Sequence, residues 1–291
     1  MCKYTNKLTN EFKKQDLEIL VSTMNRNSLD FLIPMFPFCH FSEYSILIIN
    51  QTQENNLLDS PFRSVRVINS FEKGLSKSRN LALKNAIGKI VLIADDDVEY
   101  KKDFDAVIVQ AHNQYNNKAV ISFCIQKPNG LMFKKYLSNP KMNLSLLELF
   151  NVLSIEISLN KSVLDELGIV FDENFGLGSE FQMGEEAVFL SDIKNTNQQI
   201  GFVPCVIAIH PEISSNEKFG FSQRYYVQGA FLARVLKENF FKGLVAKIFF
   251  DLKQKKLKIY HIPAAIKNAN TGKDDYYKLK DESTNHRHSK N

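Results

Sequence analysis

Uninterrupted aliphatic runs recur along the first two thirds of the chain, separated by mixed polar segments. Such runs are typical of strands buried on both faces of a parallel sheet. With one segment of two-residue alternation at 155–159, they predict strands at residues 17–23, 45–50, 65–68, 89–94, 118–124, 155–159 and 200–211. Apolar spacing and turn signals predict helices at residues 72–86, 142–150, 161–167, 187–194 and 224–238. Because strands and helices alternate with short connections, we predict an α/β fold with a mostly parallel central sheet flanked by helices.

One predicted strand ends in three consecutive acids. The aliphatic residues Ile90–Ile93 are followed, after Ala94, by Asp95, Asp96 and Asp97. Burying unpaired carboxylates is costly, so the three should lie at the carboxyl end of the strand, where open α/β sheets hold their ligands. In an extended chain Asp95 and Asp97 would point one way and Asp96 the other. Converging carboxylates suit a divalent cation carrying a polyphosphate, although a solvent-exposed acidic turn is the simpler alternative.

Composition narrows the class of protein. The chain has 291 residues, 44% of them hydrophobic and 24% charged, and the net charge of +5 is too small to predict a nucleic-acid partner. The four cysteines are scattered without a CxxC pair, which favours a reducing compartment over a disulfide scaffold or zinc site. The polar N-terminus and the lack of a long apolar window predict a cytoplasmic protein, or one peripheral on the inner face of the cell membrane.

The C-terminal part has a different character. The segment from Arg234 to Lys258 contains eight basic and two acidic residues, interleaved with phenylalanine and aliphatic residues. This pattern suits a helix lying on an anionic membrane through residues 240–258, or a helix packed on the domain with a solvated basic edge. The residues from 271 onward are polar and charged, which predicts disorder. We therefore predict an α/β domain at 1–235, a basic and aromatic helical extension at 236–270, and a disordered tail at 271–291.

Three stretches together resemble family 2 glycosyltransferases of the GT-A fold, a Rossmann-like architecture. They are Val21–Arg26, the sequence GLSKSRN at 74–80 leading into Ala94–Asp97, and Gly184–Glu186 together with His210. Their order and spacing are similar to the family pattern across roughly residues 16–235. The segment Phe175–Ser179 is similar to that of bacterial enzymes that build capsule, lipopolysaccharide or exopolysaccharide.

The resemblance implies an inverting sugar transfer from a nucleotide-diphosphate donor, with a UDP-sugar favoured. The acceptor would be a hydroxyl of a glycan or lipid-linked glycan. It also implies that Mn²⁺ or Mg²⁺ is held by Asp97, Asp95 and His210, where it would neutralise charge on the leaving diphosphate. A histidine before proline at a strand end is, as an alternative, a simple hydrogen-bonding residue.

A single displacement at the anomeric carbon also needs a general base. By the family pattern this base is Glu186, while Glu185 holds the acceptor or braces the loop. The family usually carries Glu-Asp here, so Glu186 departs from the pattern by one methylene.

The resemblance assigns Thr23, Arg26 and Asn50 to the nucleotide, although the family usually has an aspartate near Asn50 to read the base. Arg79 would neutralise a phosphate or contact the base; the alternative is that it pairs with an aspartate to hold the fold. Asp95 and Asp96 would lie on the nucleotide-sugar side, and in the family the middle aspartate tends towards ribose or structural contacts.

Two other functions stay open at this stage. A metal-dependent nucleotidyltransferase would share the acidic strand end, but the loop Thr23–Arg26 lacks the glycines expected for it. A non-catalytic protein that only binds sugar nucleotides would keep the fold and lose the chemistry. The sequence also leaves the oligomeric state open; a homodimer is one of the options.

Overall fold

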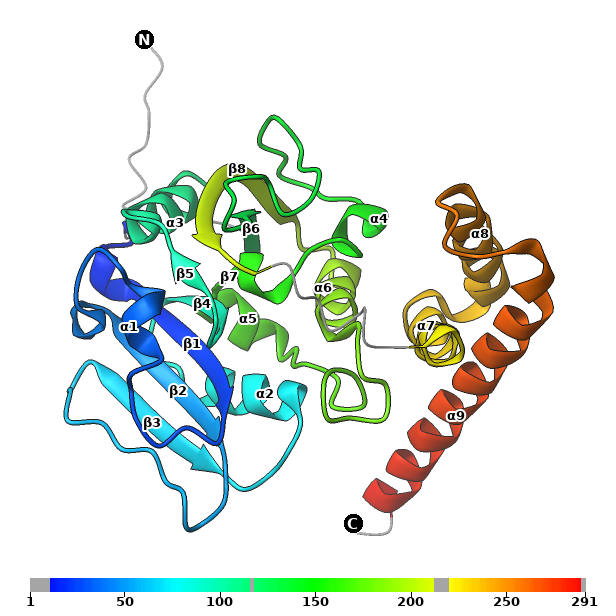
Figure 1. Ribbon diagram of the computed structural model, residues 1–291, viewed down its shortest axis with the longest axis horizontal. Helices are drawn as coiled ribbons and strands as arrows, with labels where there is room; N and C mark the ends of the chain where they lie inside the picture. Colours follow the sequence, from blue (N-terminus) through cyan, green and yellow to red (C-terminus); the bar gives the residue numbers. More distant parts are fainter. Residues whose placement is uncertain (1–10, 116–117, 212–219, 289–291) are drawn as a thin grey trace.

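A computed structural model describes residues 11–115, 118–211 and 220–288; the cysteine at position 2 and the last three residues of the predicted tail lie outside them. One sheet of eight strands forms the centre, in the order β3-β2-β1-β4-β7-β6-β8-β5 (Figure 1). The strands are β1 Leu17–Met24, β2 Ser45–Gln51, β3 Val65–Ser70, β4 Ile90–Asp95, β5 Glu99–Tyr100, β6 Val120–Gln126, β7 Ile157–Asn160 and β8 Ile200–Ile209. The helices are α1 Leu32–Met35, α2 Leu75–Asn85, α3 Phe104–Gln114, α4 Leu146–Leu149, α5 Lys161–Leu167, α6 Glu185–Asn195, α7 Phe221–Leu236, α8 Phe240–Lys253 and α9 Ile262–His288.

The sheet confirms the prediction of an α/β fold with a mostly parallel sheet. β3, β2, β1 and β4 run parallel, as do β6 and β8. β7 lies between β4 and β6 and is antiparallel to both, so β4 and β6 point the same way. The carboxyl ends of most strands therefore meet at one edge of the sheet, the edge at which open α/β sheets hold ligands.

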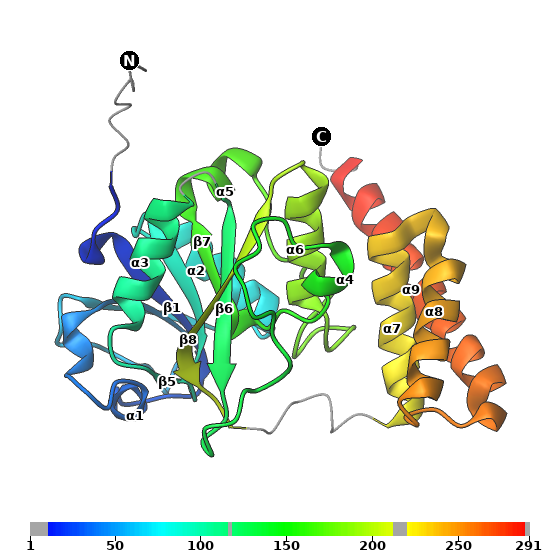
Figure 2. The same ribbon diagram turned by 90° about the horizontal axis from the view of Figure 1, so that it is seen from above.

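Helices cover both faces of the sheet because its strands are apolar on both sides (Figure 2). In β1, Ile19 packs with the layer that contains α1 and α3, while the next residue, Leu20, packs with the layer of α2, α5 and α6. The aliphatic runs thus mark strands buried on two faces, as expected.

Two elements of the structure, α3 and β5, were not predicted from the sequence. Helix α3 buries Phe104, Ile108 and Ala111 at helical spacing, a pattern that was present in the sequence. Strand β5 has only two residues and is held by antiparallel pairing with β8, so no local pattern marks it.

The C-terminal helices differ from the predicted boundaries. Helices α7, α8 and α9 share one apolar cluster, and α7, predicted as a helix at 224–238, begins at Phe221. The prediction of a disordered tail from 271 is wrong over the described residues, because α9 runs to His288. Its small residues Ala265 and Ala269 and the ring of Tyr276 are buried in that cluster. Within the described part of the chain, no helix is both long and apolar enough to cross a membrane.

Helices α7 and α9 cross in close backbone contact at Gly229 and Gly272. A Cβ on Gly229 would lie 1.9 Å from the carbonyl oxygen of Ala269. We expect Gly229→Ala to lower the free energy of unfolding by about 1–3 kcal/mol, since backbone atoms cannot move aside as a side chain can. In Gly243→Ala the new methyl meets only the side chains of Leu236 and Leu232, which can move aside, so this control should change stability much less. Equal effects of both substitutions in urea denaturation would contradict the close crossing.

His112 of α3 is buried and gives the protein a specific sensitivity to acid. Its Nε2 lies 2.8 Å from the hydroxyl of Ser158, and burial lowers the pKa of His112 to about 3. The unfolded chain binds a proton there near pH 6.5, so the free energy of unfolding falls as the pH drops below that value. Between pH 7.5 and pH 5, protonation of this one group in the unfolded chain should lower the free energy of unfolding by about 2 kcal/mol. Urea denaturation at both pH values should show a weaker pH dependence for His112→Gln; an unchanged dependence would contradict the assignment.

Candidate active site

The strand register brings the predicted nucleotide-side residues together. Thr23 of β1 is the partner of Asn50 in β2, and Ser22 is the partner of Asp95 in β4. All three strands end at the same edge of the sheet. The side chains at this edge come from separate stretches of sequence and meet only because the strands are parallel.

The three aspartates at the end of β4 each have different partners. Strand β4 ends at Asp95, and the chain then turns at Asp96 and Asp97. Asp95 pairs with Arg79, Asp96 with Arg26 and Asp97 with His210. The predicted alternation of an extended chain therefore does not apply beyond Asp95, and Asp95 and Asp97 do not form a simple pair.

Asp96 fixes the loop that follows β1. Its Oδ2 accepts hydrogen bonds from the hydroxyl of Thr23 and from Nε and Nη2 of Arg26, at 3.0 Å and 2.7 Å for the arginine. The guanidinium of Arg26 also lies over the ring of Phe31. Arg26 remains partly exposed, whereas Thr23 is buried, and Asp96 holds both in place.

Asn50 is completely buried and its amide is already engaged. Its Oδ1 accepts the backbone N–H of Arg26 at 3.0 Å, and its Nδ2 donates to the carbonyl oxygen of Arg26 and to Oδ1 of Asn69. These contacts make Asn50 a residue that positions the Arg26 loop. They differ from the predicted contact with the base, because no surface of the side chain is exposed to meet one.

Arg79 is the centre of a buried ionic network. Nη2 lies 3.2 Å from Asp95, and Nη1 lies 3.0 Å from Glu185 and 3.8 Å from Glu186. The side chain is only 2% exposed, so it does not reach a phosphate or base from this position. Of the two roles considered from the sequence, the geometry favours pairing with an aspartate to hold the fold. Arg79 thereby links the end of β4 to the start of α6.

The acidic pair Glu185–Glu186 begins α6. Gly184, with a φ of 92°, adopts a left-handed conformation that favours glycine, and this turns the chain into the helix. Glu185 is buried beneath Arg79, whereas one fifth of the Glu186 side chain is exposed. Burial and the charge of Glu186 raise the pKa of Glu185 against the opposing effect of Arg79. The more exposed carboxylate, Glu186, is thus the one available to a ligand.

Pairing of β5 with β8 brings His210 to Asp97. Glu99 pairs with Ile209, and the next residue, His210, places its Nε2 3.1 Å from Oδ1 of Asp97. The hydrogen bond from His210 lowers the pKa of Asp97. Burial lowers the pKa of His210, but the hydrogen bond and charge of Asp97 outweigh it and raise the value above normal.

Asp97 and His210 fit a divalent cation only in part. A carboxylate oxygen and an imidazole nitrogen are both acceptable ligands for manganese. Among the residues that the structure describes, however, no group of three His, Cys, Asp or Glu side chains could hold a metal on its own. Asp95, the third predicted ligand, is paired with Arg79. Oxygens of a bound diphosphate and water would have to complete the coordination.

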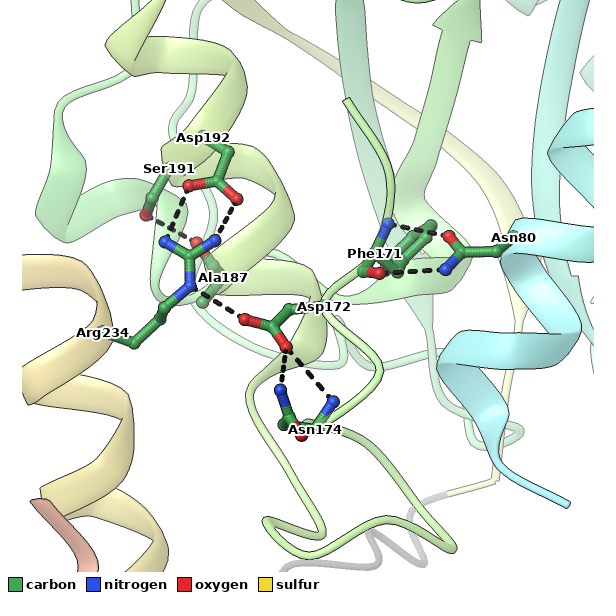
Figure 3. A network of polar contacts seen from close by, with 8 residues as sticks. All are labelled: Asn80, Phe171, Asp172, Asn174, Ala187, Ser191, Asp192 and Arg234. Carbon is green, nitrogen blue, oxygen red and sulfur yellow. Dashed lines mark hydrogen bonds and ion pairs between the residues drawn. The ribbon is translucent and has the colours of Figure 1, made fainter. Parts of the chain in front are cut away.

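The motif GLSKSRN positions the loop before α6, a role that the sequence analysis did not assign. Ser76 donates to the carbonyl oxygen of Phe175, and the N–H of Leu75 donates to the carbonyl oxygen of Leu177. The amide of Asn80 bonds both backbone groups of Phe171 (Figure 3). The sequence feature that could have revealed this role is the dense run of polar residues at the start of a predicted helix, because several residues of such a run must be buried and need hydrogen-bond partners.

The same loop is held on its other side by α7. Arg234 pairs with Asp172 at 2.9 Å and with Asp192 of α6 at 2.6 Å (Figure 3). Tyr226 of α7 donates to Glu180 at 2.8 Å. The loop that carries the acidic pair is therefore fixed between α2 and the C-terminal helices.

Comparison with known proteins agrees with this architecture. Residues 41–166 match the sequence model of the family described as Glycosyl transferase family 2. The crystal structure of S. aureus TarS 1-349 superposes with a TM-score of 0.58 at 16% identity, covering 88% of this chain and 80% of that one. TarS 1-349 in complex with UDP-GlcNAc gives 0.58 at 15% identity, and its complex with UDP gives 0.56 at 16%; each covers 93% of this chain and 91% of the other. A search of curated protein sequences finds no match.

The chain has the GT-A fold, and Arg79 joins the acidic end of β4 to the acidic pair at the start of α6. Residues 41–166 match the family 2 glycosyltransferase model, and together with the fold this match supports a glycosyltransferase.

Proposed function

We propose that the protein transfers a sugar, with inversion, from a nucleotide-diphosphate donor to an acceptor hydroxyl in cell-surface polysaccharide synthesis. The observation that carries this proposal is the ionic network Asp95–Arg79–Glu185, with Glu186 beside it. It couples the strand end that would hold the donor to the helix start that would hold the base. A single-displacement reaction needs both groups fixed relative to each other.

On the donor side, Asp97 and His210 would hold Mn²⁺ or Mg²⁺ together with the diphosphate. The cation would neutralise the charge that develops on the leaving diphosphate. The hydrogen bond between the two side chains keeps them 3.1 Å apart, so both atoms are close enough to share one ion. Arg26, held by Asp96 and partly exposed, would contact the nucleotide from the neighbouring strand end.

On the acceptor side, Glu186 would take the proton from the attacking hydroxyl. Its partial exposure and its place in the first turn of α6 support this role, because the positive end of the helix dipole favours an ionised carboxylate. Glu185, buried against Arg79, would hold the loop rather than react.

A UDP-sugar is the proposed donor. The similarity in fold to TarS crystallised with UDP-GlcNAc and with UDP supports this choice. The likeness of Phe175–Ser179 to enzymes of capsule, lipopolysaccharide and exopolysaccharide synthesis supports a glycan or lipid-linked glycan acceptor.

The proposal is tested by incubating the protein and Mn²⁺ with a panel of UDP-sugars and a panel of glycan acceptors, and by measuring UDP release. Proton NMR of the product would then give the anomeric configuration. We expect UDP release that requires added metal and falls at least 100-fold in Asp97→Ala, and a β-linked product from an α-linked donor. Binding of UDP-sugars without release, pyrophosphate release from a nucleoside triphosphate, or retention of configuration would each overturn it.

A further inference from the structure

Helix α8 has two apolar faces, and only one is used inside the protein. Phe240, Leu244 and Ile248 are buried in the cluster shared with α7 and α9. One position further along, Phe241, Val245 and Phe249 are 61%, 66% and 68% exposed. These residues recur every four positions and form a continuous stripe on the helix surface.

The exposed stripe extends into the turn after α8. Phe250 is exposed beside it, and Ile259 and Tyr260 follow at 76% and 68% exposure. We call these residues the α8 surface; its members are Phe241, Val245, Phe249, Phe250, Ile259 and Tyr260. Single exposed apolar residues are common, but six large ones on one helix and its adjoining turn mark an interaction site.

Lysines accompany the α8 surface without acidic partners. Residues 240–260 contain six lysines and one acid, Asp251. Asp251 is buried, where it accepts from Tyr225 at 2.9 Å and pairs with Lys247 at 2.8 Å. The other five lysines form no ion pair with any described residue; they are Lys242, Lys253, Lys255, Lys256 and Lys258.

We propose that the α8 surface docks the protein on an anionic lipid membrane. Large apolar side chains would enter the interfacial region while neighbouring lysines contact lipid phosphates, a combination that a neutral protein partner would not require. The packing side of α8 stays buried in the protein during docking, so the helix lies on the membrane and does not span it. The positive charge argues against a second copy of the same surface as the partner, because two lysine-rich faces repel each other.

The C-terminal end of α8 lies on the side of the molecule that carries the candidate active site. The connection from α8 to α9 and the carboxyl end of β6 are on the same side in Figure 2. Since β4 is parallel to β6, the acidic end of β4 faces that side too. A membrane docked there would bring an acceptor carried by a lipid close to the site; this consequence rests on the proposed function, whereas docking itself does not.

Docking is tested with the full chain by co-sedimentation with vesicles of phosphatidylcholine alone and with 30% phosphatidylglycerol. We expect binding at least tenfold stronger to the anionic vesicles and weaker binding as salt is raised. Phe241→Ser/Phe249→Ser should lower binding at least tenfold, and Lys255→Glu/Lys256→Glu should lower it by a similar or larger factor, since each lysine contributes about fivefold.

Matched controls separate docking from loss of folding or general charge. Leu147→Ser removes an equally exposed apolar side chain on α4, and Lys84→Glu/Lys135→Glu makes the same charge change elsewhere; both should bind like the unmodified protein. Circular dichroism melting should be unchanged in all four variants, because the substituted side chains are exposed. Equal binding to both kinds of vesicle, no binding, or a concentration-dependent dimer that Phe241→Ser/Phe249→Ser abolishes would overturn the proposal. None of these measurements depends on sugar-transfer activity, so failure of the docking proposal can be distinguished from failure of the proposed function.

Discussion

Replacing Glu186 by glutamine is expected to lower kcat for sugar transfer by about 10²–10⁴-fold. The amide keeps the size and hydrogen-bonding shape of the side chain but cannot take a proton from the acceptor. Because the proposed donor site lies at the other end of the Arg79 network, the Kd for UDP should stay within about threefold of the unmodified value. Steady-state kinetics and calorimetric titration with UDP measure the two quantities.

Glu166→Gln is the matched control for this experiment. Glu166 is an exposed glutamate on α5, remote from the acidic pair, and the same chemical change there should leave kcat unaltered. If Glu186→Gln kept more than a tenth of the unmodified kcat, Glu186 would not be the base, and the proposed mechanism would lose its proton acceptor.

Replacing Arg79 by methionine is expected to lower the free energy of unfolding by about 3–5 kcal/mol. The substitution leaves Glu185 and Asp95 facing each other without their shared cation in a buried network. The loss should be smaller in Arg79→Met/Glu185→Met, since the double variant removes a buried charge along with its partner. Urea denaturation at pH 7.5 measures both.

Lys77→Met provides the comparison at the surface of the same helix. Lys77 pairs with the exposed Glu72 at 2.8 Å, and solvent screens such pairs, so no measurable change in stability is expected. If Arg79→Met were as well tolerated as Lys77→Met, the buried network would not hold β4 and α6 together, and the link between the two halves of the site would be lost.

The sheet could be predicted from the sequence because its strands are buried on two faces. Continuous aliphatic runs such as Ile90–Ile93 leave little choice of structure, and the acids that follow have to lie at a strand end. The proximity of Asp97 to His210 was suggested by the family resemblance. The structure explains it through the two-residue strand β5, which no local pattern could reveal.

The individual roles at the site could not be predicted in the same way. The family resemblance assigned Asn50 to the nucleotide and left Arg79 between a ligand contact and an ion pair with an aspartate. Tertiary packing buries both side chains and uses their polar groups internally. The C-terminal part of α9 was not predicted, for the opposite reason. Its contact with α7 depends on small residues such as Ala269 and on Gly229 opposite, which carry almost no hydrophobic signal.

The central claim is that the end of β4 holds a cation and a nucleotide diphosphate across from Glu186. A crystal structure of the protein with UDP and Mn²⁺, with anomalous diffraction recorded at the manganese edge, tests it most directly. We predict one anomalous peak coordinated by Asp97, His210 and the diphosphate. UDP bound without a peak at these side chains, or UDP bound away from the end of β4, would contradict the account.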